Sequence, residues 1–134
     1  MNGLTVLFDS VRPAVEHLKA RGMTLAIVST KYRSRIEAFL ERERLLQNFA
    51  LILGGEDVAR HKPDSEGLLQ AAGLLNAPLG ATLYVGDSVV DAEAARRAGV
   101  AFAAVLSGVT GREEFDGYRL AALLENLGQL EGCL

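Results

Sequence analysis

Two aspartates stand at the start of an expected helix, directly after a short apolar run. Asp87 follows residues 83–86, and Asp91 comes four positions later, so the first helical turn can bring both carboxylates to one point. Two carboxylates that converge in this way can hold a hard cation such as Mg²⁺ through oxygen ligands and water. In a simpler interpretation, Asp91 is an acid that the helix dipole favours near the helix start. The pair therefore predicts either a metal site or an ordinary helix beginning.

Other polar side chains follow other expected strands. Ser29 and Thr30 come directly after one apolar run, and Lys62 comes in the loop after the next. Hydroxyl and backbone N–H groups donate to phosphate oxygens, and an ammonium neutralises charge on a transferring phosphoryl group. Each residue alone is also typical of a turn or a surface loop. Because the carboxyl ends of parallel strands lie at one edge of a sheet, the set predicts a joint site for a phosphate group and its metal ion.

The elements that must position these residues alternate along the chain. Strands are expected over residues 4–8, 24–28, 49–53, 82–85 and 100–106, and helices over residues 11–21, 34–44, 65–75, 92–98 and 120–127. A capping box of Ser34 and Glu37 is expected to open the second helix, Asp64 or Ser65 to cap the third, and Gly99 to end the fourth. This order predicts an α/β fold with a mainly parallel five-stranded sheet and helices on both faces. Residues 1–134 form one domain in this prediction, with residues 129–134 as a frayed tail.

Composition narrows the class of protein. The chain has 134 residues, 49% of them apolar and 23% charged, which fits a single globular domain. A net charge of −3 without a basic run argues against nucleic acid as the main partner. The single cysteine, Cys133, excludes an internal disulfide and favours a reducing compartment, and the sequence contains neither a membrane-spanning run nor an opening signal peptide. The composition predicts a soluble cytoplasmic protein.

Three segments in the same order resemble motifs of the haloacid dehalogenase-like hydrolases, in the phosphoglycolate phosphatase-like branch. Residues 25–31 resemble the second motif, residues 54–58 with 62–64 the third, and residues 85–91 the fourth. The resemblance covers about residues 11–108 and implies a three-layer Rossmann-like core. It also implies Mg²⁺ as cofactor and hydrolysis of a small phosphorylated metabolite through an aspartyl phosphate. In this family the matching positions bind phosphate (Ser29, Thr30 and Lys62, the last also catalytic) or metal (Asp87 and Asp91).

The first motif departs from the family pattern. Members carry Asp-x-Asp-Gly-Thr at the end of the first strand, where the first aspartate attacks phosphorus and the second is the general acid and base. Here Asp9 ends the strand, Val11 stands where the second aspartate belongs, and no Gly-Thr follows. The cap domain, which in this branch comes between the nucleophile and the second motif, is absent as well. The resemblance therefore predicts phosphate and Mg²⁺ binding with weak or absent turnover.

Two alignments of the first residues remain open. In one, residues 5–9 are the first strand, and Asp9 is the candidate nucleophile and a third metal ligand. In the other, residues 7–11 lead from a cap back into the core, and the nucleophile strand is missing. An empty central position would leave two rows of backbone N–H and C=O groups without partners, and residues 4–8 are an apolar segment that could fill it. A third interpretation makes Asp9 a helix N-cap.

A second class of function is also open. An unfilled central strand position and a missing cap would expose apolar surface, which is typical of a module that self-associates or binds a protein partner. Such a chain would still bind phosphate and magnesium but would not turn over. His17 and His61 lack partners at the spacing of metal ligands or catalytic triads, so both are predicted to be bystanders.

Overall fold

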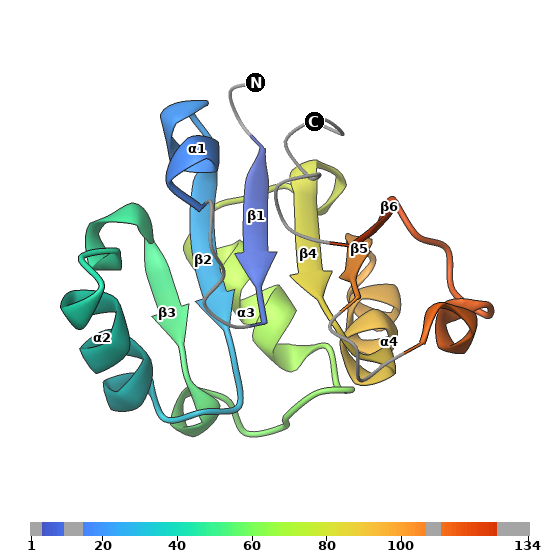
Figure 1. Cartoon of the computed structure of the whole chain (residues 1–134). Coiled ribbons are helices and arrows are strands. Elements are labelled where there is room, and N and C mark those ends of the chain that lie inside the picture. Colours follow the sequence, from blue (N-terminus) through green and yellow to red (C-terminus); the bar gives the residue numbers. More distant parts are fainter. Residues whose placement is uncertain (1–3, 10–14, 107–110, 126–134) are drawn as a thin grey trace.

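The computed structural model describes residues 4–9, 15–106 and 111–125, and these form a six-stranded parallel sheet. The strand order across the sheet is β3-β2-β1-β4-β5-β6, and all strands point the same way (Figure 1). Their bounds are Thr5–Phe8 (β1), Thr24–Val28 (β2), Leu51–Leu53 (β3), Thr82–Gly86 (β4), Ala101–Val105 (β5) and Ala122–Leu124 (β6). The predicted parallel α/β class is confirmed, with one strand more than expected.

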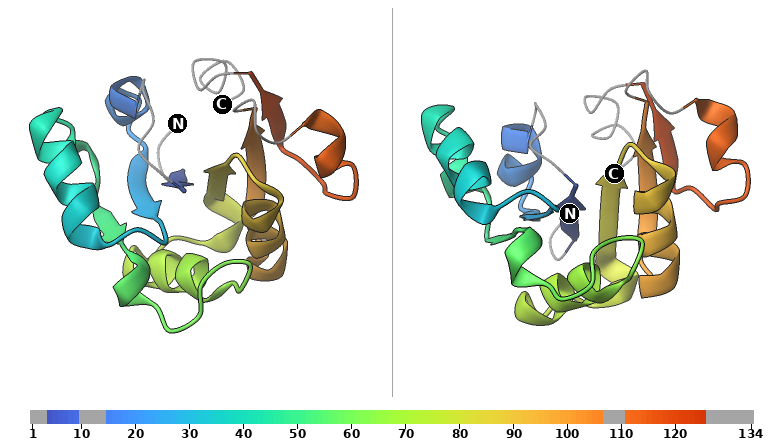
Figure 2. Two further views of the ribbon diagram at one scale, coloured as in Figure 1. Left: turned by 60° about the horizontal axis from the view of Figure 1, so that its bottom comes forward. Right: turned by 90° about the horizontal axis from the view of Figure 1, so that it is seen from below.

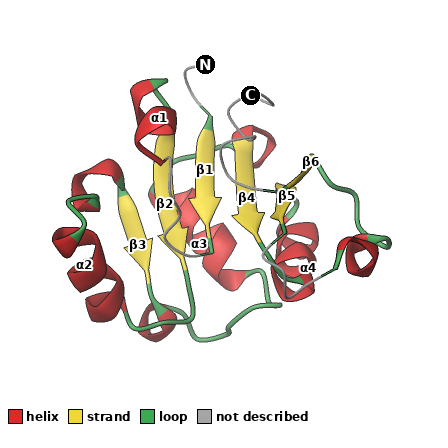
Figure 3. Cartoon of the chain, viewed as in Figure 1, coloured by secondary structure: helices red, strands yellow, loops and turns green. Residues whose placement is uncertain are grey.

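Helices cover both faces of this sheet, as the views in Figures 2 and 3 show. They are α1 (Val15–Ala20), α2 (Arg33–Arg42), α3 (Glu66–Leu74) and α4 (Val89–Ala98). Side chains of α1 and α2 pack in one buried cluster, and side chains of α3 and α4 pack in the other, across the sheet. No helix among the described residues combines the length and the apolar character that a bilayer crossing requires. The result is the three-layer arrangement that the alternation of elements predicts.

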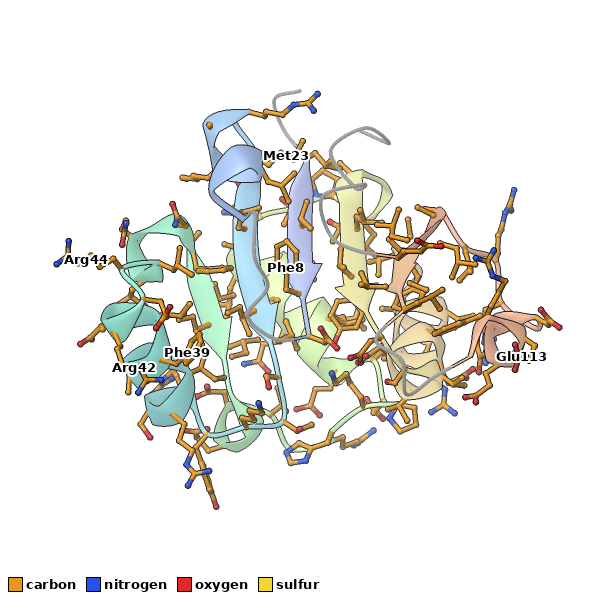
Figure 4. The ribbon with its side chains drawn as sticks, in the orientation of Figure 1. Phe8, Met23, Phe39, Arg42, Arg44 and Glu113 are labelled. Atoms are coloured by element: carbon orange, nitrogen blue, oxygen red, sulfur yellow. The ribbon has the colours of Figure 1, made fainter. Side chains whose placement is uncertain are left out.

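The central strand β1 is buried on both faces. Val6 and Phe8 belong to the cluster beneath α1 and α2, whereas Leu7 belongs to the cluster beneath α3 and α4, as the two-residue period of a strand requires. Phe8 packs edge-to-face against Phe49, with 6.4 Å between the ring centroids (Phe8 is labelled in Figure 4). A strand that is paired on both sides and covered on both faces reads as a continuous apolar run. This packing fixes the position of the residue that follows it, Asp9.

The predicted last helix, residues 120–127, is wrong over residues 122–124. These residues form β6, which pairs in parallel with β5 at the sheet edge, Ala104 opposite Leu123 and Val105 opposite Leu124. Leu123 packs with one buried cluster and Leu124 with the other, so the segment has the alternation of a strand. A short leucine-rich run has no periodicity that separates strand from helix, and here pairing with β5 decides.

The capping box predicted for α2 is also wrong. Tyr32 is the N-cap residue, and Ser34 lies inside the helix. The Arg33 backbone N–H donates instead to both carboxylate oxygens of Glu56, at 3.0 and 3.2 Å. This hydrogen bonding lowers the pKa of the Glu56 carboxyl. The acid that caps α2 therefore comes from the loop after β3.

Other predicted helix ends agree better with the structure. The Glu66 backbone N–H donates to Asp64 Oδ1 at 2.9 Å at the start of α3. Gly99 ends α4 in the left-handed conformation, with φ of 79°. The first helix is described from Val15 onward; Val11, the side chain of His17, and the tail with Cys133 lie outside what the structure describes.

Glu56→Ala is expected to lower the melting temperature by a few degrees, because the first N–H group of α2, that of Arg33, then loses its carboxylate acceptor. Glu37→Ala is the matched control, since Glu37 is a half-buried acid of α2 that the sequence pattern predicts to be a capping residue and the structure does not. Thermal unfolding followed by circular dichroism compares the two variants. A larger effect of Glu37→Ala would support the sequence-based capping box.

Candidate active site

Asp9 lies at the carboxyl end of the central strand. β1 pairs with β2 on one side and with β4 on the other, and the Asp9 backbone N–H donates to the Val85 carbonyl at 3.1 Å. Residues 5–8 therefore fill the position between the strands that lead to the second and fourth motifs. This is the placement required by the alignment in which residues 5–9 are the first strand of the core. The central position of the sheet is therefore filled. The role of Asp9 as nucleophile stays a prediction.

Three carboxylates gather at this edge. One oxygen each from Asp9, Asp87 and Asp91 lies within 4.8 Å of the others. Mg²⁺ binds oxygen at about 2.1 Å, so two ligands of one ion lie no more than about 4.2 Å apart. Three carboxylates at this spacing repel one another unless a cation lies between them. The cluster therefore fits a magnesium ion in ligand type, and the 4.8 Å limit on its spacing lies slightly above what one ion spans.

Asp91 also belongs to the start of α4. Its backbone N–H donates to Ser88 Oγ at 3.2 Å, and Ser88 Oγ in turn donates to Asp91 Oδ2 at 3.0 Å. Ser88 is thus the N-cap residue of α4, and its hydroxyl satisfies one of the N–H groups that the helix leaves free at its start. The two interpretations of Asp91 are therefore compatible, because the cap fixes the carboxylate that faces the other two aspartates.

Lys62 forms a buried ion pair with Asp91. Lys62 Nζ lies 2.6 Å from Asp91 Oδ1, and the two side chains are only 12% and 3% exposed. Burial raises the pKa of the Asp91 carboxyl, but the charge of Lys62 and hydrogen bonds from Lys62 and Ser88 outweigh burial and keep this pKa below its usual value. Asp91 is therefore anionic at neutral pH, as a metal ligand must be.

The three residues predicted to bind phosphate lie around one small cavity. Ser29, Thr30 and Lys62 line it together with His61, and its volume is about 10 Å³. Ser29 Oγ accepts a hydrogen bond from the Lys31 backbone N–H at 3.2 Å. The predicted residues thus form a continuous series, in which Ser29 shares a cavity with Lys62, Lys62 pairs with Asp91, and Asp91 joins the acidic cluster.

The loop after β3 braces the loop that carries Ser29 and Thr30. The Gly55 backbone N–H donates to the Lys31 carbonyl at 2.8 Å, and the His61 ring Nε2 lies 2.8 Å from the Gly55 carbonyl oxygen. A Cβ at Gly55 would lie 2.4 Å from the Thr30 carbonyl oxygen, so this approach requires glycine. His61 therefore has a structural partner, and the prediction that it is a bystander to the chemistry is untested.

Sequence reasoning missed Tyr84, which it took as one of the apolar residues of a strand. Its hydroxyl lies 2.8 Å from Lys62 Nζ and 3.1 Å from Asp91 Oδ1. The sequence could have indicated this role, because Tyr84 stands in an apolar run directly before Gly86 and Asp87. A tyrosine buried there needs a polar partner for its hydroxyl, and the site residues are the nearest candidates. The hydroxyl reaches both members of the ion pair.

Comparison with known proteins agrees with this geometry. The model of the haloacid dehalogenase-like hydrolase family matches residues 2–105. Phosphoglycolate phosphatase of Pseudomonas syringae pv. syringae is 30% identical over 131 residues, which are 97% of this chain and 48% of that protein. Pyrophosphatase PpaX of Bacillus mycoides is 32% identical over 123 residues, which are 92% of this chain and 57% of that protein. The chain thus spans about half the length of these curated relatives.

Solved structures give the same result. A crystal structure of a Bacteroides fragilis protein, assigned to the haloacid dehalogenase-like hydrolases, is 48% identical with a TM-score of 0.85. The match covers 89% of this chain and 57% of that one. Family model, relatives and fold agree on the resemblance that the three motifs indicate. The chain therefore belongs to the haloacid dehalogenase-like hydrolases, in the phosphoglycolate phosphatase-like branch.

Proposed function

We propose that this chain binds Mg²⁺ and a phosphate group at the carboxyl edge of the sheet, as the core of a phosphatase for a small phosphomonoester. The ion would be held by Asp9, Asp87 and Asp91, and the phosphate by Ser29, Thr30 and Lys62. The observation that carries the proposal is the cluster of three carboxylates within 4.8 Å of one another, with a buried lysine beside it. Because the cavity beside Ser29 has room for about one water molecule, the phosphate would lie at the open edge outside it.

The residues present allow only part of the chemistry. Bound Mg²⁺ would neutralise charge on the phosphate oxygens. The Asp9 carboxylate would attack phosphorus, forming an aspartyl phosphate as the bond to the leaving oxygen breaks, and water would then hydrolyse this intermediate. The leaving oxygen needs a proton, and Val11 has none to give. We therefore expect binding of phosphate and magnesium with weak or absent turnover.

Asp9→Asn is expected to weaken Mg²⁺ binding about tenfold or more and to remove any hydrolysis, because it takes a charged ligand from the acidic cluster. Isothermal titration with Mg²⁺ and hydrolysis of p-nitrophenyl phosphate measure the two effects. Asp116→Asn, at an exposed aspartate at the end of the turn 112–115, is the matched control. Absence of Mg²⁺ binding by the wild-type chain would contradict the proposal. Fast hydrolysis abolished by Asp9→Asn would instead make the chain a competent enzyme despite Val11.

The alternative is a non-catalytic module that self-associates or binds a partner. One of the two observations behind this alternative was an unfilled central strand position, and β1 fills that position. The other ground is exposed apolar surface, and among the described residues Tyr32, Phe39, Leu69, Leu74, Leu79 and Val90 are large apolar side chains that are exposed. Light scattering after size-exclusion chromatography separates the two functions, since a monomer at high concentration argues against self-association.

A further inference from the structure

A fully buried tyrosine joins the core of the sheet to the ion pair of the candidate active site. Tyr84 is 0% exposed and lies in β4, opposite Leu7 of β1 and Phe102 of β5. Its ring packs against the Phe102 ring, with 6.1 Å between centroids. The ring is therefore held by the core, and its hydroxyl has a fixed place at the carboxyl edge.

The hydroxyl has polar contacts with Lys62, Asp91 and Val28. It accepts a hydrogen bond from Lys62 Nζ at 2.8 Å. Its single proton can go to Asp91 Oδ1 at 3.1 Å or to the Val28 carbonyl at 3.3 Å. A buried phenol needs only one partner to offset its desolvation, and the Val28 carbonyl alone would provide it. The contacts to Lys62 and Asp91 are thus more than the burial of a tyrosine requires.

These contacts determine how the Lys62 ammonium is oriented. An ammonium has three N–H donors, and two of them go to Asp91 Oδ1 and to the Tyr84 hydroxyl. Lysine is a point charge on a flexible stem, and a single contact with Asp91 would leave it free to turn. The third N–H has no acceptor among the residues that the structure describes.

We propose that Tyr84 is a positioning residue, which holds the Lys62 ammonium so that its third N–H faces the phosphate. The inference rests on the proposed function for the identity of the ligand, and on the geometry above for the orientation of Lys62. In this role Tyr84 acts on the phosphate through Lys62, with which its hydroxyl is hydrogen-bonded. Its hydroxyl, rather than its ring, is the group that matters.

Tyr84→Phe tests the orientation without any need for turnover. The variant keeps the ring against Phe102 and loses one oxygen. Brief acetylation with acetic anhydride, followed by mass spectrometry, reports the reactivity of Lys62 relative to exposed Lys31. The Lys62-to-Lys31 ratio is expected to rise about tenfold, the factor that corresponds to a lost hydrogen bond to a charged group. Circular dichroism and urea unfolding establish that the variant is folded at the labelling temperature.

Tyr118→Phe is the matched control, because it removes a hydroxyl that donates to Glu93 Oε1, in the middle of α4, at 3.0 Å. Its labelling ratio should equal that of the wild type. In the same set, titration with inorganic phosphate in the presence of Mg²⁺ should give about tenfold weaker binding for Tyr84→Phe only. An unchanged ratio in Tyr84→Phe overturns the inference, whatever happens to phosphate. If the wild type binds no phosphate, the proposed function fails, and the ratio still decides whether Tyr84 holds Lys62.

Discussion

Lys62→Met is expected to destabilise the fold by about 3–5 kcal/mol at neutral pH and to remove phosphate binding. The Asp91 carboxylate is 3% exposed, and the substitution leaves it buried without its cation. The free energy of unfolding in urea measures the first effect, and titration with inorganic phosphate measures the second. Lys31→Met is the matched control, because Lys31 is exposed and has no ion pair within the described part of the chain, so its cost should stay below about 0.5 kcal/mol.

The pH dependence of this loss follows from the pKa of Asp91. In the wild type this pKa is below its unfolded value of 3.8, so the stabilisation is complete above pH 3.8 and is lost as pH falls through the folded pKa. Without Lys62, burial is the largest remaining influence, and we expect it to raise the pKa of Asp91 above the unfolded value. The penalty is then full above the raised pKa and shrinks as pH falls through it. The gap between wild type and Lys62→Met should therefore narrow toward acid pH, and a gap that does not change with pH would contradict the assignment.

A double variant isolates the pair. Asp91→Asn alone removes the carboxylate but leaves the Lys62 ammonium, whose side chain is 12% exposed, without its anion. Combining it with Lys62→Met removes both charges, so the double variant should be more stable than the sum of the two single losses predicts. Simple additivity would mean that the contact of 2.6 Å contributes no coupling between these residues.

The placement of the main site residues could be predicted because it follows from strand ends. Ser29 and Asp87 come directly after buried strands, and a parallel sheet brings such positions to one edge. The position of Asp9 could not be assigned from the sequence, because its short strand could be aligned with the family pattern in two ways. Only the pairing of β1 with both β2 and β4 distinguishes these alignments, and pairing depends on segments far apart in the chain.

The features that sequence did not predict depend on contacts between distant segments. Glu56 caps α2 from 23 residues away, so no local pattern marks it as a capping residue. The run 122–124 is a strand because the edge of β5 is available to it, although its composition suits a helix equally well. The sequence pattern predicts Tyr84 to be a core residue, and its ring does pack in the core. Its hydroxyl, however, reaches Lys62, 22 residues earlier in the chain. In each case the local pattern is consistent with two structures, and tertiary contacts decide between them.

Gly86→Ala is expected to cost roughly 1–3 kcal/mol and to weaken Mg²⁺ binding at least about tenfold. A Cβ at Gly86 would lie 2.6 Å from Asp91 Oδ2 and 2.7 Å from Asp91 Cβ, well inside van der Waals contact. Asp91 has little freedom to move away, since Ser88 holds one carboxylate oxygen and Lys62 the other. The methyl group must therefore push the carboxylate or the first turn of α4 away from the acidic cluster.

Gly73→Ala on α3 makes the same chemical change where nothing lies within 4 Å of the added Cβ. Because alanine restricts the unfolded chain and favours helix, this variant should be more stable than the wild type by roughly 0.5 kcal/mol, with unchanged Mg²⁺ binding. Urea unfolding and isothermal titration compare the two variants. The same added methyl group should thus lower the free energy of unfolding at Gly86 and raise it at Gly73. The difference arises because the missing side chain of Gly86 makes room for the Asp91 carboxylate. Equal stabilities and equal Mg²⁺ affinities would show that Asp91 can shift freely, and the rigid acidic cluster that underlies the proposed metal site would be excluded.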